Sequence, residues 1–260
     1  MPRAIALAYG GFCYVAFFLT FLYAIGFLAN LVVPKSIDSG VPGPIGQAIV
    51  VNLALLSVFA LQHSIMARQG FKRVWTRIVP KPVERATYVI ASSAAMWLLF
   101  GLWQPMPAVV WSFDGLAGAM LTGLFFLGIA TVLYSTFLID HFDLFGLRQV
   151  VLYFQGKPYT EKRFSTPSLY QHVRHPLYVG WFMTFWFTPQ MSVGHLLFAS
   201  VASAYILVAV LFEESDLLEL LGEDYRRWRE HTPAFIPRFG SRRKTATANH
   251  AAGRTARQES

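Results

Sequence analysis

The sequence predicts an all-α fold, a polytopic bundle of five to six transmembrane helices in which the last two form a helical hairpin. Two observations support this prediction. Of the 260 residues, 55% are hydrophobic and only 14% are charged, whereas charged residues make up about 25% of a soluble domain. Several long stretches also lack any charged side chain, and most of them are long enough to cross about 30 Å of hydrocarbon as a helix.

The membrane segments follow from these charge-free stretches. The last stretch, residues 177–212, is long enough for two passes, and Pro189 and Gly194 interrupt it where a continuous helix would break. We therefore expect a hairpin whose first arm is short or broken, since residues 177–188 would rise only about 18 Å as a helix. The expected membrane segments are residues 4–33, 44–66, 86–103, 115–139, 177–188 and 194–212.

The first apolar segment begins just after Arg3, as a secretory signal would. It is longer than the apolar core of about 7 to 15 residues in such signals and lacks a small-residue cleavage site, so we expect a retained helix. Cys13 is the only cysteine, which excludes a disulfide within the chain and a cysteine-based zinc site. We expect a single domain, residues 1–239, followed by a disordered basic tail, residues 240–260.

Basic residues predict the orientation of the chain in the membrane. The connection at residues 67–85 contains six Lys or Arg side chains and one acid, whereas the next connection, residues 104–113, contains no Lys or Arg. The positive-inside rule therefore assigns the first of these connections to the cytoplasm. The later connections alternate in the same way, which predicts an even number of passes and both termini in the cytoplasm.

The net charge of +8 raises the question of nucleic-acid binding. The basic residues lie beside the expected helix ends and in the tail, where they attract anionic lipid headgroups. We therefore expect membrane lipids as partners and no nucleic acid. We expect no metal site either, because no pair of histidines at ligand spacing has a third partner.

Two polar segments flank the expected hairpin. The first, residues 166–180, leads into the membrane, and Pro176 suits the first turn of a helix. Unpaired backbone N–H groups at such a helix entrance can bind an anion or a carboxylate. The second segment begins after the hairpin. Because a hairpin returns the chain to the side that it left, we expect Arg174 and His175 to lie near Glu213 and Glu214.

The same two segments carry a family resemblance. Arg-His-Pro-Leu-Tyr-Val-Gly at residues 174–180, followed by Glu-Glu-x-x-Leu-x-x-x-Leu-Gly-x-x-Tyr-x-x-Trp at residues 213–228, resembles the isoprenylcysteine carboxyl methyltransferase superfamily. Leu221 and Trp228 stand where that superfamily usually has Phe and Tyr. The resemblance implies a site for S-adenosyl-L-methionine in a cytoplasmic C-terminal region. The residues that it assigns to this cofactor are Arg174, His175, Pro176, Tyr178, Gly180 and Glu214.

Further segments resemble one branch of that superfamily, the methanethiol S-methyltransferases, which make dimethyl sulfide. This resemblance implies that residues 1–239 form a methyltransferase of the bacterial inner membrane. The implied reaction is an in-line transfer of the methyl group of S-adenosyl-L-methionine to the thiolate of methanethiol, at the cytoplasmic side. The matching segments are Tyr9–Tyr14, Phe21–Phe27, Val33–Asp38, Leu61–Ser64, His141–Gln149 and Thr188–Pro189.

Attack by a thiolate requires a group that takes the proton of the thiol. His63 lies near the cytoplasmic end of the second segment, and an ionisable group at membrane depth suggests function. A neutral histidine bonded to a neighbouring helix explains it equally well. His141 follows the fourth segment, where its alternative role is to stabilise a helix C-terminus. We predict His141 and His63 as candidate bases and Asp143 as a group that orients a base.

Simpler interpretations and other functions stay open at this point. Arg174 and His175 can bind lipid phosphates, and Glu213 and Glu214 can be solvated acids that begin a separate helix after the hairpin. We expect Tyr225 and Trp228 to be anchors at the membrane interface. Another acceptor, such as an isoprenylcysteine carboxylate or a lipid amine, would fit the same superfamily. A membrane transport or assembly protein is the alternative from another class, but the segments contain few of the ionisable groups that a polar pathway needs.

Overall fold

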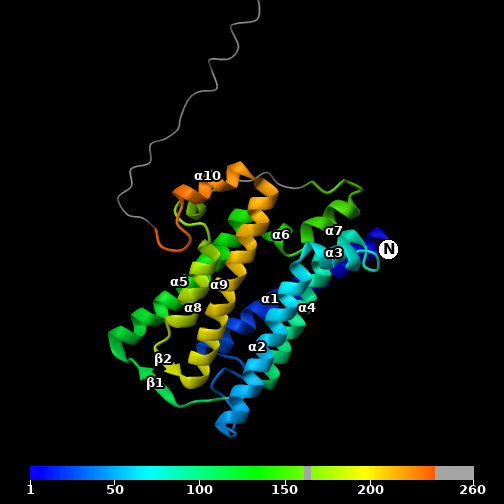
Figure 1. Cartoon of the computed structure of the whole chain (residues 1–260). Coiled ribbons are helices and arrows are strands. Elements are labelled where there is room, and N and C mark those ends of the chain that lie inside the picture. Colours follow the sequence, from blue (N-terminus) through cyan, green and yellow to red (C-terminus); the bar gives the residue numbers. More distant parts are fainter. Residues whose placement is uncertain (161–164, 238–260) are drawn as a thin grey trace, which may run out of the picture.

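The computed structural model describes residues 1–160 and 165–237, so the expected tail at residues 240–260 lies outside the described residues. Long helices form a bundle with a two-stranded sheet at one end (Figure 1). The elements are α1 Arg3–Ala29, α2 Ile45–Ala67, α3 Gln69–Trp75, α4 Lys81–Leu102, β1 Val109–Ser112, α5 Gly115–Ile139, α6 His141–Leu144, α7 Leu147–Phe154, the 3-10 helix η1 Ser168–Gln171, α8 Pro176–Trp186, β2 Gln190–Ser192, α9 Val193–Leu221 and α10 Glu223–His231.

Five of the described helices are long and apolar enough to cross a membrane, namely α1, α2, α4, α5 and α9. The prediction of a polytopic helix bundle is therefore confirmed. Several helices differ in extent from the predicted membrane segments. The first helix ends at Ala29 because Asn30 takes a left-handed conformation with φ 54°. The third predicted segment lies in α4, which begins already at Lys81. Pro80 and Pro82 favour a helix start there, because a proline in the first turn lacks an N–H group that would have no partner in any case.

The first arm of the expected hairpin is a short helix with an extended continuation. α8 has 11 residues, too few to cross the hydrocarbon alone. The chain then continues through β2, which pairs antiparallel with β1. The indole Nε1 of Trp111 donates to the carbonyl of Thr188 at 3.2 Å. These bonds satisfy polar backbone groups that a helix would otherwise satisfy internally. Both strands are additions to the predicted all-α fold.

The second arm, α9, is longer than predicted. It has 29 residues and ends where Gly222 takes a positive φ of 57°. A helix of this length rises about 44 Å, more than the roughly 30 Å of hydrocarbon. The interpretation of Glu213 and Glu214 as the start of a separate helix was therefore wrong, because no residue between Val193 and Leu221 breaks the helix. Both glutamates lie in its last turns, beyond the apolar part.

α8 packs along α5, and two glycines allow this close approach. A Cβ atom at Gly180 would lie 2.7 Å from the carbonyl oxygen of Gly128 and 2.8 Å from the backbone nitrogen of Val132. Because these are backbone atoms, they cannot turn aside as a flexible side chain would. The glycine pair therefore sets how deeply α8, with the polar residues at its start, sits in the bundle.

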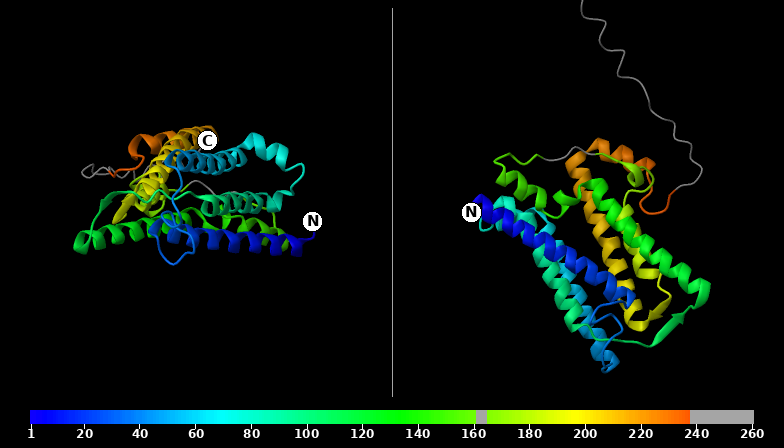
Figure 2. Two further views of the ribbon diagram at one scale, coloured as in Figure 1. Left: turned by 90° about the horizontal axis from the view of Figure 1, so that it is seen from below. Right: turned by 180° about the vertical axis from the view of Figure 1, so that it is seen from behind.

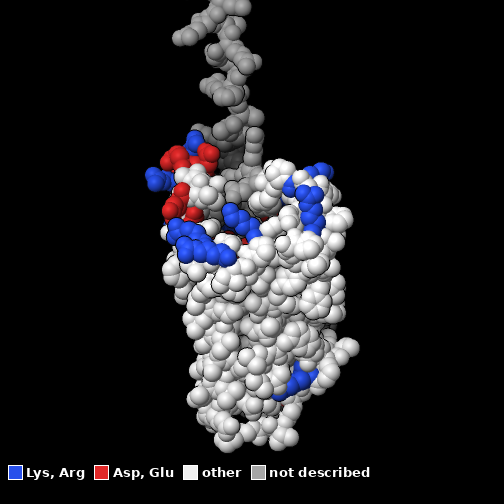
Figure 3. Space-filling model, turned by 90° about the vertical axis from the view of Figure 1, so that its right-hand side faces the viewer, with Lys and Arg blue, Asp and Glu red and all other residues white. Residues whose placement is uncertain are grey.

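Most of the charged residues gather at one end of the bundle. Figure 3 shows blue and red side chains at this end, above a broad uncharged zone, and a smaller blue group near the opposite end. We call the end with most of the charged residues the basic end. Figure 1 and the rear view in Figure 2 place the N-terminus, α3, α7 and α10 there, opposite the small sheet. The basic residues on these elements and connections include Arg3, Arg68, Lys72, Arg73, Arg148, Arg226, Arg227 and Arg229.

Candidate active site

At the basic end, the carboxylate of Glu214 joins two guanidinium groups and one imidazole. Its Oε1 atom accepts from Arg174 Nε at 2.8 Å and lies 2.7 Å from Arg174 Nη2 and 3.0 Å from His175 Nε2. Its Oε2 atom lies 3.2 Å from Arg229 Nε. Glu214 is only 7% exposed. The sequence-based expectation that Arg174 and His175 meet the glutamates across the hairpin is confirmed.

The segment before α8 is held by the end of the described chain. The backbone N–H groups of Arg174 and His175 donate to the carbonyls of Pro233 and Ala234 at 2.8 and 3.0 Å. Arg174 Nη1 also donates to the carbonyl of Thr232 at 2.6 Å. These two N–H groups are therefore already bonded within the protein and are not available to an anion.

Glu213 takes part in the same cluster. The Tyr178 hydroxyl donates to Glu213 Oε2 at 2.8 Å, and that oxygen lies 3.9 Å from His175 Nδ1. The His175 ring stacks on the Tyr178 ring, with centroids 5.6 Å apart, and the Phe235 ring lies 5.9 Å from it. His175 thus lies between two carboxylates and two aromatic rings.

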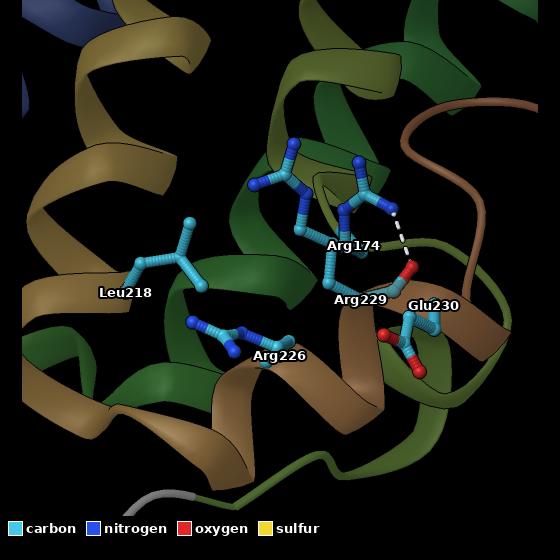
Figure 4. Close-up of a pocket in the computed structure, with 5 residues that line it drawn as sticks. All are labelled: Arg174, Leu218, Arg226, Arg229 and Glu230. Carbon is cyan, nitrogen blue, oxygen red and sulfur yellow. Dashed lines mark hydrogen bonds between the residues drawn. The ribbon is translucent and has the colours of Figure 1, made fainter.

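A cavity of about 320 Å³ adjoins this cluster. Figure 4 shows the guanidinium groups of Arg174, Arg226 and Arg229 around it, with one carboxylate, that of Glu230. The lining is therefore positively charged overall. Such a group of guanidinium forks suits a planar anion, such as a carboxylate. Sequence reasoning missed Arg226 and Arg229, although their spacing of three residues puts them on one face of a helix.

The structure assigns different neighbours to the other residues of the motif. Pro176 is buried in the first turn of α8, as predicted. Gly180 faces Gly128 of α5, and the close packing of the two helices by itself requires a glycine at this position. The expectation that Tyr225 is an interfacial anchor was wrong, since Tyr225 is 0% exposed. Burial, and then the charge of Glu214, raise the pKa of Tyr225 to about 12.

The chain is similar over nearly its whole length to several proteins named methanethiol S-methyltransferase. It is 53% identical to the methanethiol S-methyltransferase of Crocosphaera subtropica over 243 residues. This alignment covers 93% of this chain and 95% of that relative. It is 54% identical over 238 residues to the methanethiol S-methyltransferase of Mycobacterium tuberculosis, or 91% of this chain and 98% of that relative. The chain belongs to the methanethiol S-methyltransferase family. The predictions of this branch and of a methyltransferase are confirmed.

More distant similarity extends beyond the methanethiol S-methyltransferases. A Nurim homolog of Drosophila pseudoobscura pseudoobscura is 31% identical over 195 residues, or 72% of this chain and 76% of that relative. No protein-family model matches the chain. No solved structure matches it significantly.

In this member of the methanethiol S-methyltransferase family, His141 lies in a buried aromatic environment. Its Nε2 atom is 2.8 Å from the Tyr14 hydroxyl and its Nδ1 atom 2.9 Å from the Thr136 hydroxyl. Burial lowers the pKa of His141, and the negative charge of Asp140 offsets part of this decrease. Asp143 does not orient this ring as predicted, because both ring nitrogens bond elsewhere and Asp143 pairs with Arg148 at 3.0 Å.

His63, the other predicted base, lies between α2 and α4. The Tyr88 hydroxyl is 2.8 Å from its Nε2 atom and 3.0 Å from its Nδ1 atom, and the Ser92 hydroxyl is 3.2 Å from Nδ1. Sequence reasoning missed Tyr14, Tyr88 and Ser92, although hydroxyls inside apolar helices are a usable signal. Within residues 1–160 and 165–237, no group of three or more His, Cys, Asp or Glu side chains is placed to hold a metal ion.

Proposed function

We propose that this chain methylates methanethiol to dimethyl sulfide, with S-adenosyl-L-methionine as the methyl donor. One observation carries the proposal beyond family membership. The motif before α8 and the motif at the end of α9 close around Glu214, where Arg174 and His175 bond to its carboxylate. This arrangement gives a polar cluster beside a cationic cavity and an apolar helix bundle, which suits a charged donor and an apolar acceptor.

The side chains in and beside the cluster match the chemical groups of S-adenosyl-L-methionine. The guanidinium groups of Arg226 and Arg229 match its carboxylate. The half-exposed carboxylate of Glu213 matches its positive charge and its hydroxyl groups. The aromatic rings of Tyr178 and Phe235 beside His175 suit a planar base. The residues that would hold the donor are Arg174, His175, Pro176, Tyr178, Gly180, Glu213, Glu214, Arg226, Arg229 and Phe235.

When bound, the donor supplies a methyl group already activated on a positively charged sulfur. The protein then has to position the acceptor sulfur in line with this group and exclude water. The charge-paired cluster of Arg174, His175 and Glu214 fixes the start of α8 and with it Tyr178. The apolar side chains around that helix keep the reaction site dry, which favours a reaction between a thiolate and a cation.

The test uses protein purified in detergent. With methanethiol and S-adenosyl-L-methionine, dimethyl sulfide should appear in the headspace, and omission of the donor should abolish it. His175→Ala should lose calorimetric binding of S-adenosylhomocysteine, because His175 lies inside the cluster. His172→Ala is the matched control, since His172 is exposed in the same segment, and it should bind normally. Normal binding by His175→Ala would overturn the site.

Other outcomes identify the alternatives. Binding of S-adenosylhomocysteine without a thiol product would direct the search to an isoprenylcysteine carboxylate or a lipid amine as acceptor. A protein that binds neither donor nor product would favour transport or assembly. Hydrogen sulfide as a competing acceptor would show how narrowly the site selects small thiols.

We also propose that the basic end faces the cytoplasm across a bacterial inner membrane, because basic residues prefer that side. Impermeant maleimide applied to intact cells should label Val41→Cys, which lies in the α1–α2 connection and is 90% exposed, and should leave His172→Cys unlabelled. The native Cys13 is 0% exposed and gives little background. The reverse labelling pattern would refute this orientation.

A further inference from the structure

The two buried histidines have similar hydrogen-bond patterns, although the Tyr88 hydroxyl lies near both ring nitrogens of His63, closer to Nε2 than to Nδ1. At His141, the Thr136 hydroxyl donates to the carbonyl of Leu133 at 2.7 Å. At His63, the Ser92 hydroxyl donates to the carbonyl of Tyr88 at 3.0 Å. Each hydroxyl has only one proton, so it must accept from the Nδ1–H group of its histidine. The Nε2 atom then carries the lone pair and accepts from a tyrosine hydroxyl. We call each arrangement a Tyr-His relay.

The relays differ in their surroundings. His141 is enclosed by aromatic rings, with Phe137 stacked 4.3 Å away and Phe145 at 4.9 Å. The relay of Tyr88 and His63 has polar neighbours instead. Ser64 bonds to the Tyr205 hydroxyl of α9 at 3.0 Å, and the Arg85 guanidinium lies 5.0 Å from the centre of the Tyr88 ring.

The Tyr88 relay also adjoins the candidate active site. Ser64, the residue after His63, bonds to Tyr205 of α9, and Arg68 pairs with Asp216 of α9 at 3.1 Å. These contacts hold the end of α2 that carries His63 against the part of α9 that carries Glu213, whose carboxylate accepts from the Tyr178 hydroxyl. No contact of this kind connects Tyr14 with Glu213 or Glu214 among the described residues.

We propose that Tyr88 and His63 take the proton of the acceptor thiol. The S–H proton passes to the Tyr88 oxygen while the Tyr88 O–H proton passes to His63 Nε2. This leaves a thiolate and an imidazolium whose Nδ1–H group stays bonded to Ser92. The thiolate forms the new sulfur–carbon bond, and the electron pair of the broken bond stays on the donor sulfur. The imidazolium later releases its proton to water. This inference rests on the proposed function.

The Arg85 guanidinium over Tyr88 favours a negative charge on the phenol oxygen or on the thiolate nearby, and it disfavours the positive charge that His63 gains. The imidazolium therefore releases its proton readily. The other titratable groups whose charges act on the relay are Glu84 of α4, Tyr205 of α9 and Tyr178 of α8 with its partner Glu213. His63 must be neutral to accept a proton, so turnover should fall as the pH is lowered through the pKa of its imidazole.

The experiment compares Tyr88→Phe with Tyr14→Phe. Both substitutions remove one hydroxyl from a relay and keep the ring, so they are matched in chemistry and in size. Tyr88→Phe should lower kcat for methanethiol by about 10²–10⁴-fold, the usual contribution of acid–base catalysis, and should leave S-adenosylhomocysteine binding unchanged. Tyr14→Phe should keep kcat within a few-fold of wild type.

The pH profile separates catalysis from packing. Tyr88→Phe and His63→Gln should regain activity as the pH rises, by roughly tenfold per unit below the pKa of the thiol, because free thiolate replaces the relay. Equal kcat values for Tyr88→Phe and Tyr14→Phe, or a Tyr88→Phe defect that is independent of pH, would overturn the proposal. A wild-type protein that makes no dimethyl sulfide would instead refute the proposed function.

Discussion

Glu214→Gln should abolish binding of S-adenosylhomocysteine and destabilise the protein by about 3–5 kcal/mol, the usual effect of breaking a buried ion pair. The substitution keeps the shape of the side chain but removes its charge. Arg174 and Arg229 would then face each other beside His175 with no carboxylate between them. A glutamine also turns one accepting oxygen into a donating NH₂ group, which opposes a guanidinium. Thermal unfolding in detergent and calorimetric titration measure the two effects.

Glu213→Gln is the matched control for this prediction. The Glu213 side chain is 44% exposed, so water screens the loss of its charge. The substitution keeps an oxygen that can accept from Tyr178. Its unfolding temperature should therefore stay close to that of the wild type. Equal destabilisation by the two substitutions would contradict the central place of Glu214 in the cluster.

Gly180→Ala should destabilise the bundle by about 1–3 kcal/mol, the usual cost of overpacking. The added methyl group would meet backbone atoms of Gly128 and Val132 at 2.7–2.8 Å, so α8 must move away from α5. That movement carries Tyr178 and the start of α8 with it. We therefore expect a lower unfolding temperature and weaker S-adenosylhomocysteine binding.

Gly123→Ala on α5 is the control for Gly180→Ala. A Cβ atom at Gly123 meets nothing within 4 Å, and alanine favours a helix over glycine by up to about 1 kcal/mol. Gly123→Ala should therefore be neutral or slightly stabilising. If Gly180→Ala were equally harmless for stability but abolished binding, the predicted contact of Gly180 with the cofactor would gain support over its packing role.

The helix bundle was predictable because its signal is local. The absence of charge over residues 115–139 defines α5 with the observed bounds. The meeting of Arg174 with Glu214 was also predictable, since a chain that crosses and returns brings its two flanks to one side. The helix end at Asn30 and the length of α9 were harder to predict from the sequence, because a polar residue can either continue a helix or end it.

Other features had no local signal. β1 and β2 are paired across the chain, and their residues look like any short apolar connection. Gly180 was assigned to the cofactor by resemblance, whereas its contacts lie on α5. The candidate bases His63 and His141 were found, but their tyrosine partners were not, because those tyrosines come from distant helices.

The sequence by itself determined that this chain is a polytopic membrane protein with two motifs that meet on one side. It could do so because hydrocarbon excludes charges and unpaired backbone groups, and each segment meets that requirement alone. Only the tertiary structure decided which hydroxyl bonds to His63 or His141 and which guanidinium groups surround Glu214. Those pairings depend on how each helix is rotated and crossed against its neighbours, and packing across the whole bundle sets those angles.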